Sequence, residues 1–103
     1  MASIAVFVDD LMLSSRVTES LTASGHQPII ARSAREAEGA VLVVCDLDCV
    51  DHSEMVALGI PVIGFYSHVD QETRQRAEEA GVELVIPRSR MARELPDLIA
   101  RFL

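Results

Sequence analysis

Four short apolar runs constrain the fold of this chain more than any other feature. They span residues 4–8, 41–45, 60–65 and 82–86 and are rich in Val and Ile. Most are apolar throughout rather than alternating with polar residues, which is typical of strands covered on both faces, as in a parallel sheet. A weaker fifth run covers residues 29–31, after Pro28. The sequence therefore predicts a parallel sheet of five strands.

Helical signals separate the first three runs. After the first run, apolar residues recur at a spacing of four: Leu13, Val17 and Leu21. Gly25 is a suitable stop for that helix. Residues 33–36 (Ser-Ala-Arg-Glu) have the pattern of a capping box, but Gly39 leaves room for barely more than one turn. We therefore expect the second helix to be very short.

The later helices follow the same alternation. Asp46 and Pro61 lie so close in sequence that the third helix must also be short. Residues 71–80 are predicted to form a polar helix, and residues 95–103 the last helix, with Pro96 in its first turn because a proline inside a helix is costly. Strands and helices in this order predict one open three-layer α/β domain over residues 1–103, with right-handed crossovers. The side of the sheet with the short helices should be thinly covered.

The charge balance excludes some functions. The chain has 16 acidic and 9 basic residues, and all nine basic residues are Arg. A net charge of −7 argues against nucleic-acid binding but is compatible with a protein partner that has a basic patch. No apolar run approaches the ~20 residues of a membrane span. Asp9 and Asp10 interrupt the first apolar stretch, so no signal peptide is expected. Two cysteines do not make a disulfide framework, which favours the reducing cytoplasm.

Acidic residues follow two of the predicted strands. Asp9 and Asp10 come after the first strand, and Asp46 and Asp48 after the third. In such sheets these strand ends meet at one edge, where ligands bind. The same edge should receive the residues that follow the last two strands: Tyr66, Ser67 and Arg88. Converging carboxylates repel each other unless a cation is present, and oxygen ligands suit Mg²⁺. Asp10 before a helix equally fits an N-cap.

At this point the chain resembles the receiver domains of two-component response regulators, over essentially all 103 residues. Residues 6–10 (Val-Phe-Val-Asp-Asp) resemble the first strand of that family with its acid pair. Residues 43–46 (Val-Val-Cys-Asp) resemble the strand that presents the phosphoacceptor aspartate. Residues 60–63 (Ile-Pro-Val-Ile) resemble the start of the fourth strand, and residues 77–81 with the strand and Arg88 that follow are similar to the end segment.

The resemblance implies a flavodoxin-like sandwich with strand order 2-1-3-4-5 and short second and third helices. By implication, Asp46 accepts a phosphoryl group from a phosphohistidine. Asp9 and Asp10 would hold Mg²⁺ together with Asp46, and the main chain at Asp48 would complete the protein ligands. Phosphoryl transfer needs a positioned nucleophile and charge neutralisation more than covalent help, which agrees with this set.

The resemblance also implies partners. A histidine kinase or a phosphotransfer protein would donate the phosphoryl group, and an unspecified downstream protein would receive the signal. Since no effector domain follows, the output is expected to be a protein contact through the last helix, the fifth strand and the helix over residues 71–80. The same face could support a homodimer. Neither a nucleic acid nor a membrane is expected as a partner.

Three positions depart from the family pattern. Arg88 followed by Ser89 stands where the family has Lys, usually followed by Pro. Tyr66 stands at the family's Thr/Ser position, with Ser67 one residue later, and Val85 replaces its aromatic switch residue. Arginine keeps the charge and can grip phosphate with two N–H groups, but its shape differs from that of lysine. These departures favour an alternative: a pseudo-receiver that acts as an interaction or dimerisation module without phosphotransfer.

A second alternative is enzymatic. Residues 46–50 (Asp-Leu-Asp-Cys-Val) also fit the motif of haloacid-dehalogenase-like phosphatases. Asp46 would then be the nucleophile and Asp48 the acid/base, with Ser67 and Arg88 as phosphate contacts. That family has its nucleophile near the N-terminus and its acid pair late, whereas here the acid pair comes first. This alternative is therefore the less favoured one.

Two smaller features have ordinary explanations. Cys45, Cys49 and His52 could be taken as metal ligands, but Cys45 lies inside an apolar strand, where a thiol behaves as a small hydrophobe. Zinc sites usually have closer cysteine pairs and a fourth ligand at standard spacing. His68 is expected at the edge with the acidic residues, either as a phosphate contact or as a solvated loop residue.

Overall fold

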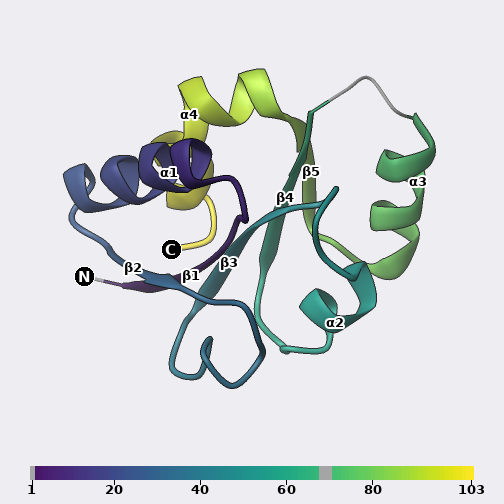
Figure 1. The fold of residues 1–103 in the computed structure, drawn as a ribbon, viewed down its shortest axis with the longest axis horizontal. Helices are drawn as coiled ribbons and strands as arrows, with labels where there is room; N and C mark the ends of the chain where they lie inside the picture. The colour runs from purple at the N-terminus through teal and green to yellow at the C-terminus, as the bar shows by residue number, and fades with distance from the viewer. Residues whose placement is uncertain (1, 68–70) are drawn as a thin grey trace.

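The strands form one five-stranded parallel sheet in the order β2-β1-β3-β4-β5, which confirms the predicted fold class and strand order (Figure 1). This computed structural model describes residues 2–67 and 71–103. The elements are β1 (Ser3–Phe7), α1 (Leu11–Ala23), β2 (Gln27–Ile30), β3 (Leu42–Asp46), α2 (His52–Val56), β4 (Val62–Tyr66), α3 (Gln71–Ala80), β5 (Leu84–Pro87) and α4 (Arg88–Ala100). Each strand lies within one or two residues of its predicted run.

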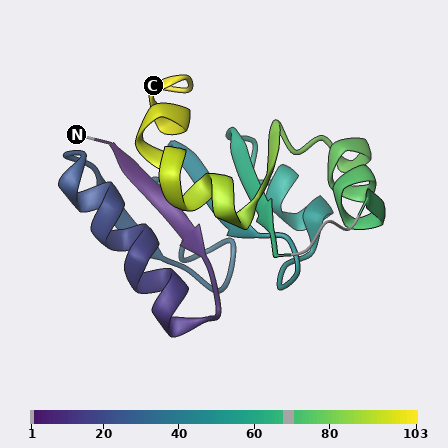
Figure 2. The same cartoon turned by 90° about the horizontal axis from the view of Figure 1, so that it is seen from above.

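Helices cover both faces of the sheet. α1 and α4 lie on one face, and α2 and α3 lie on the other (Figures 1 and 2). Along β3, Leu42 and Val44 join the core under α1 and α4, while Val43 and Cys45 join the core on the opposite side. Because both faces are buried, the strands are apolar at consecutive positions. Within the described ranges, no helix has the length and apolar character needed to cross a membrane.

The first helix forms as predicted. α1 buries Leu13, Val17 and Leu21 against the sheet. Gly25 has a φ of 85°, which a residue with a side chain rarely adopts, and it follows the helix directly after Ser24. The N–H of His26 then donates to the carbonyl of Leu21 at 3.0 Å, which closes the C-terminus.

The predicted second helix is absent, so this prediction was wrong. Residues 33–39 form turns between β2 and β3. One of the two capping-box contacts is present: the N–H of Glu36 donates to Ser33 Oγ at 3.4 Å, but Glu36 Oε1 accepts from the N–H of Arg32 at 3.1 Å rather than from that of Ser33. Gly39, with a φ of 90°, ends the segment before propagation can offset the cost of nucleating a helix. The short third helix is confirmed as α2.

The last helix begins earlier than predicted. α4 starts at Arg88 rather than at residue 95, and Pro96 lies in its interior. Its apolar stripe already begins at Met91 and continues at helical spacing with Leu95, Leu98 and Ile99. Pro96 removes the N–H that would bond the carbonyl of Ala92, but both residues are exposed, so water can satisfy that carbonyl. Burial of the stripe stabilises the helix across the proline.

Candidate functional site

Asp46 is the central residue of the candidate site. It ends β3, the middle strand of the sheet, and is 8% exposed. Among the residues that the structure describes, it is the one acidic side chain that is buried. Its Oδ1 accepts a hydrogen bond from the N–H of Asp48 at 3.0 Å, and its Oδ2 accepts one from the thiol of Cys49 at 3.4 Å. The loop after β3 therefore holds both carboxylate oxygens.

The acid pair after β1 has divided roles. Asp9 and Asp10 are both exposed. Asp10 is the N-cap of α1, and its Oδ1 accepts a hydrogen bond from the N–H of Leu13 at 3.0 Å. Asp9 is close enough to Cys49 for its charge and its backbone both to influence the pKa of that thiol. Asp10 therefore serves the helix, while Asp9 lies on the Cys49 side of the site.

Cys49 links the two strand ends, a role that sequence reasoning missed. Desolvation, followed by the charge of Asp46 and the hydrogen bond to it, raises the pKa of the Cys49 thiol to about 11. The charge of Asp9 also raises this pKa, and the backbone of Asp9 lowers it. At neutral pH Cys49 is therefore a protonated thiol that donates to Asp46. A cysteine three residues after a strand-end aspartate was the only available signal, since a turn at this point brings the two side chains together.

The acidic residues do not form a metal site in this arrangement. Over residues 2–67 and 71–103, no three His, Cys, Asp or Glu side chains gather closely enough to hold a metal ion. Asp10 is committed to Leu13, and Asp46 to Asp48 and Cys49. Carboxylate oxygens are the type of ligand that Mg²⁺ prefers, but in this arrangement they are not gathered around one point. The cysteine–histidine cluster also does not assemble, since Cys45 is fully buried and His52 shares a hydrogen bond with the carbonyl of Leu47 at 2.9 Å.

Ser67 contacts Asp48 rather than Asp46. Its hydroxyl donates to Asp48 Oδ2 at 2.6 Å, and its N–H donates to the same oxygen at 3.1 Å. Tyr66, at the end of β4, is buried in the core cluster under α2 and α3. Neither hydroxyl is therefore bonded to the candidate phosphoacceptor.

The other expected site residues lie around this edge. Arg88, the first residue of α4, is exposed, and its side chain forms no hydrogen bond or ion pair within the described ranges. Val85 is half-buried on β5 and packs against the core under α2 and α3. His68 lies outside the described residues. The structure thus brings Asp9, Asp46 and Asp48 to the loop after β3 and leaves Arg88 without a bond to Asp46.

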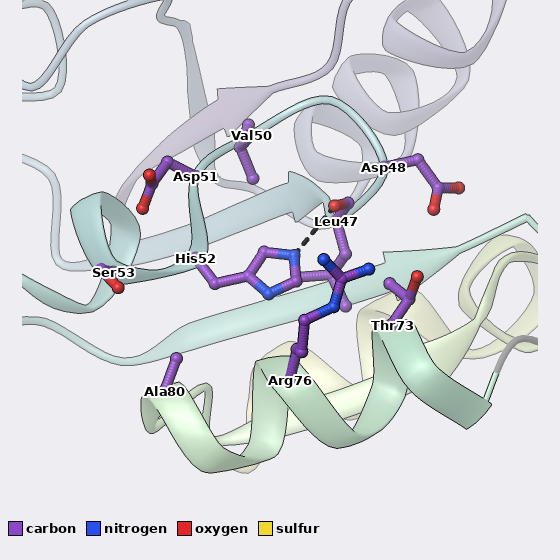
Figure 3. A pocket seen from close by; sticks show the side chains of 9 residues that line it. All are labelled: Leu47, Asp48, Val50, Asp51, His52, Ser53, Thr73, Arg76 and Ala80. Atoms are coloured by element: carbon purple, nitrogen blue, oxygen red, sulfur yellow. Dashed lines mark hydrogen bonds between the residues drawn. The ribbon is translucent and has the colours of Figure 1, made fainter.

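A groove of about 530 Å³ runs between α3 and the loop after β3, and sequence reasoning also missed it. Figure 3 shows His52 and Arg76 in this groove, with the ring nitrogen of His52 hydrogen-bonded to the carbonyl of Leu47. Asp48 and Asp51 contribute carboxylates to the same lining. Because cationic and acidic groups both line this groove, its charge alone favours no single class of ligand.

Comparisons with known proteins place the fold. No protein-family model and no curated protein matches the sequence. The receiver domain of Francisella response regulator 1452 is 15% identical with a TM-score of 0.80, over 99% of this chain and 96% of that one. A DNA-binding response regulator of the LuxR family from Staphylococcus aureus is 16% identical with a TM-score of 0.81, over 99% and 98%. NtrX from Brucella abortus, in complex with ADP, is 23% identical with a TM-score of 0.83, and the match covers 99% of this chain and 27% of NtrX.

Proposed function

From the receiver-domain fold that this chain adopts, we propose that the protein is a receiver-like domain of two-component signalling that accepts a phosphoryl group on Asp46. The observation that carries this proposal is the position of Asp46. A buried carboxylate at the end of the central strand is costly unless hydrogen bonds hold it, and this one has two. Asp48 and Cys49 fix its orientation, which is what an in-line phosphoryl transfer requires of its nucleophile.

The proposed reaction is a transfer between two side chains. A carboxylate oxygen of Asp46 attacks the phosphorus of a phosphohistidine on the donor protein. The P–N bond breaks, an acyl phosphate forms on Asp46, and the departing imidazole takes up a proton from solvent. Oδ2 is the oxygen bonded to the weaker donor, the thiol of Cys49, so we assign the attack to Oδ2.

Magnesium binding at this edge stays a prediction, and we expect it to be weak. Asp9 is the one carboxylate of the expected set that the described residues leave uncommitted. If the three carboxylates had to turn toward one another to share a cation, the bond from Leu13 to Asp10 Oδ1 and the bond from Cys49 to Asp46 Oδ2 would be strained or lost. Each lost bond costs about 1 kcal/mol or more, which lowers the net affinity.

The proposed partners follow from the same resemblance. A histidine kinase or a phosphotransfer protein is the proposed donor, in the cytoplasm. The proposed output is a protein contact, or a homodimer, through the face formed by α3, β5 and α4. The net charge of −7 supports a partner with a basic contact surface.

One contact favours a second candidate, the pseudo-receiver that acts without phosphotransfer. Ser67 is already tied to Asp48 at 2.6 Å, so the loop after β4 is held toward the loop after β3 with no phosphoryl group on Asp46. Under this candidate, Asp46→Asn leaves partner binding unchanged. Under the main proposal, the same substitution abolishes phosphorylation-dependent binding.

The deciding experiment measures intact mass after incubation with acetyl phosphate and Mg²⁺. We expect a phosphoryl adduct on the full chain and on Asp51→Asn, a matched control in which an exposed aspartate of the neighbouring loop loses its charge, but none on Asp46→Asn. Absence of the adduct under conditions that label a control receiver overturns the proposal. Omission of Mg²⁺ tests the magnesium prediction. Steady turnover of a generic phosphoester would instead support the phosphatase alternative, and none is expected.

A further inference from the structure

We propose that a hollow between the first turns of α1 and α4 binds a phosphate monoester. The hollow measures about 380 Å³, and its polar lining comes from Arg16 of α1, Arg88 and Ser89 of α4, and Ser67. Leu13 and Pro87 are part of its apolar wall. Asp46 does not line it, so the hollow adjoins the proposed phosphoacceptor and shares the edge residues Ser67 and Arg88 with it, but a ligand bound there goes beyond the proposed function.

The charge of this hollow is opposite to that of the protein. The chain carries a net charge of −7, and each of four other hollows on the described surface is lined by at least one carboxylate. Among the residues that the structure describes, the lining of the hollow between α1 and α4 has two arginines and no carboxylate. A concave patch with one sign of charge attracts counter-ions of the other sign.

Both arginines are available for a ligand. Arg74 and Arg90 form ion pairs with glutamates one turn away along their own helices. The side chains of Arg16 and Arg88 form no hydrogen bond or ion pair within the part of the chain that the structure describes. Two guanidinium groups on one hollow repel each other, and an anion between them relieves that repulsion. A dianion does so best, since each guanidinium can donate two N–H groups to its oxygens.

The start of α4 supplies further donors. The N-cap of α4 is Pro87, which makes no side-chain capping bond, so the first N–H groups of this helix have no cap. The positive end of a 13-residue helix favours an anion. Ser89 adds a hydroxyl donor. Ser67 lines the hollow but offers no donor to a ligand, because its N–H and its hydroxyl both donate to Asp48.

The apolar wall distinguishes a phosphate monoester from a bare inorganic ion. Leu13 and Pro87 would contact the carbon group of the ester while the arginines hold its oxygens. The monoester could be a free small molecule or a phosphorylated side chain of another protein, since the phosphate and the first carbons are the same in both. The two sources differ in what lies outside the hollow.

The test is a titration of the ¹⁵N-labelled full chain with phenyl phosphate, in a chelator and without Mg²⁺, followed by amide chemical shifts. We expect saturable shifts at Arg88, Ser89 and Arg90. Arg16→Gln should weaken binding at least threefold, about the loss expected for an exposed charged contact. The matched control is Arg93→Gln, an exposed arginine of the same helix that does not line the hollow, and it should leave the affinity unchanged.

Further arms separate the sources and the two sites. Inorganic phosphate should bind more weakly than phenyl phosphate, and a phosphoserine peptide that binds more tightly than free phosphoserine identifies a protein source. Asp46→Asn should retain binding. Loss of binding in Asp46→Asn would place the ligand at the phosphoacceptor and overturn this inference. The proposed phosphorylation of Asp46 is tested independently, by the intact-mass experiment. The inference is also overturned if Arg16→Gln and Arg93→Gln weaken phenyl phosphate binding equally, or if chloride produces the same amide chemical-shift changes.

Discussion

The hydroxyl of Ser67 lies 2.6 Å from Oδ2 of Asp48 and donates a hydrogen bond to it, although the two residues are 19 positions apart in sequence. The Ser67 N–H donates to the same oxygen, so one carboxylate ties the loop after β4 to the loop after β3. In the arrangement implied by the receiver resemblance, a hydroxyl of this loop would meet a phosphoryl group on Asp46. In this structure the Ser67 hydroxyl instead donates its hydrogen bond to Asp48.

Replacing Ser67 by Ala should lower the free energy of unfolding by about 1 kcal/mol, because the substitution removes a charge-assisted but exposed hydrogen bond. Urea denaturation measures this change, and Ser53→Ala is the matched control, since Ser53 is exposed on α2. Asp48→Asn should produce a smaller loss, as the amide oxygen still accepts. Equal stability of Ser67→Ala and the parent chain contradicts the assigned role.

Cys49 should react slowly with iodoacetamide at pH 8 and faster in Asp46→Asn. Desolvation and the charge of Asp46 raise the pKa of this thiol to about 11, so little thiolate is present. Removing the charge lowers the pKa of Cys49 toward the ordinary cysteine value of 9.0 and raises the thiolate fraction. Peptide mass spectrometry locates the adduct on Cys49 rather than on buried Cys45. Asp51→Asn should react at the parent rate, and equal acceleration by both variants excludes a specific effect of Asp46.

Gly64→Ala should destabilise the fold by about 1–3 kcal/mol. A Cβ on Gly64 would lie 2.5 Å from Cδ2 of Leu47, 2.7 Å from its Cγ and 2.9 Å from its Cδ1. Leu47 is 3% exposed and packed in the core cluster, so its side chain must shift toward the groove beside α3 to admit the new methyl group. The double variant Gly64→Ala/Leu47→Ala should show a favourable coupling free energy in thermal or urea denaturation, since removing Leu47 removes the clash. Additive losses would mean that the two residues do not compete for space.

Stability should fall above pH 9 because of Cys45. Burial, followed by the charge of Asp46, raises the pKa of this thiol to about 12 in the folded chain, against an ordinary value of 9.0. Below pH 9 the Cys45 thiol is protonated in both the folded and the unfolded chain, and its full contribution to the free energy of unfolding is present. As the pH rises from 9 toward 12, that free energy falls by up to about 1.4 kcal/mol per pH unit, because the unfolded chain loses the thiol proton first. Urea denaturation between pH 7 and about 11 should show a shallower decline for Cys45→Ala. If the free energy of unfolding falls equally steeply with pH in the parent chain and in Cys45→Ala, titration of Cys45 is not the cause of the decline.

Asp10 should tolerate Asn but not Ala. Its side chain caps α1 by accepting from Leu13, and Asn is an equally good N-cap. Asp10→Ala should lower the free energy of unfolding by about 1 kcal/mol, while Asp10→Asn should leave it nearly unchanged. Asp9→Asn is the control for charge at the neighbouring position. If Asp10→Asn is as unstable as Asp10→Ala, the negative charge rather than the capping bond stabilises this turn.

Local patterns were sufficient to predict the sheet. The three central strands β1, β3 and β4 are buried on both faces, so their unbroken apolar runs follow directly from their place in the sheet, whereas the partly exposed edge strand β2 has only a weaker run. Asp46 could be placed at the functional edge for the same reason, because it directly follows such a run. The turns at residues 33–39 and the early start of α4 were missed. A capping-box sequence can form local hydrogen bonds without a helix, and the first turn of α4 is polar until Met91.

The finer structure of the site was outside the reach of sequence reasoning. The contact between Ser67 and Asp48 joins two loops, and the bond from Cys49 to Asp46 depends on how one turn closes. Neither contact produces a periodic pattern. From the sequence, Asp10 could be either a metal ligand or the N-cap of a helix. The structure shows that its side chain caps α1.

The turn-only connection between β2 and β3 makes this side of the molecule the natural place to lengthen the chain. Its inward contacts are small side chains, mainly Ala31, Ala37 and Ala40, and the segment carries no helix that an insertion would interrupt. Doubling the length of a flexible connection costs only about 0.6 kcal/mol. A reporter peptide inserted beside Gly39 would therefore leave the Asp46 edge intact and give a probe of partner binding on a face that the proposed contacts do not use.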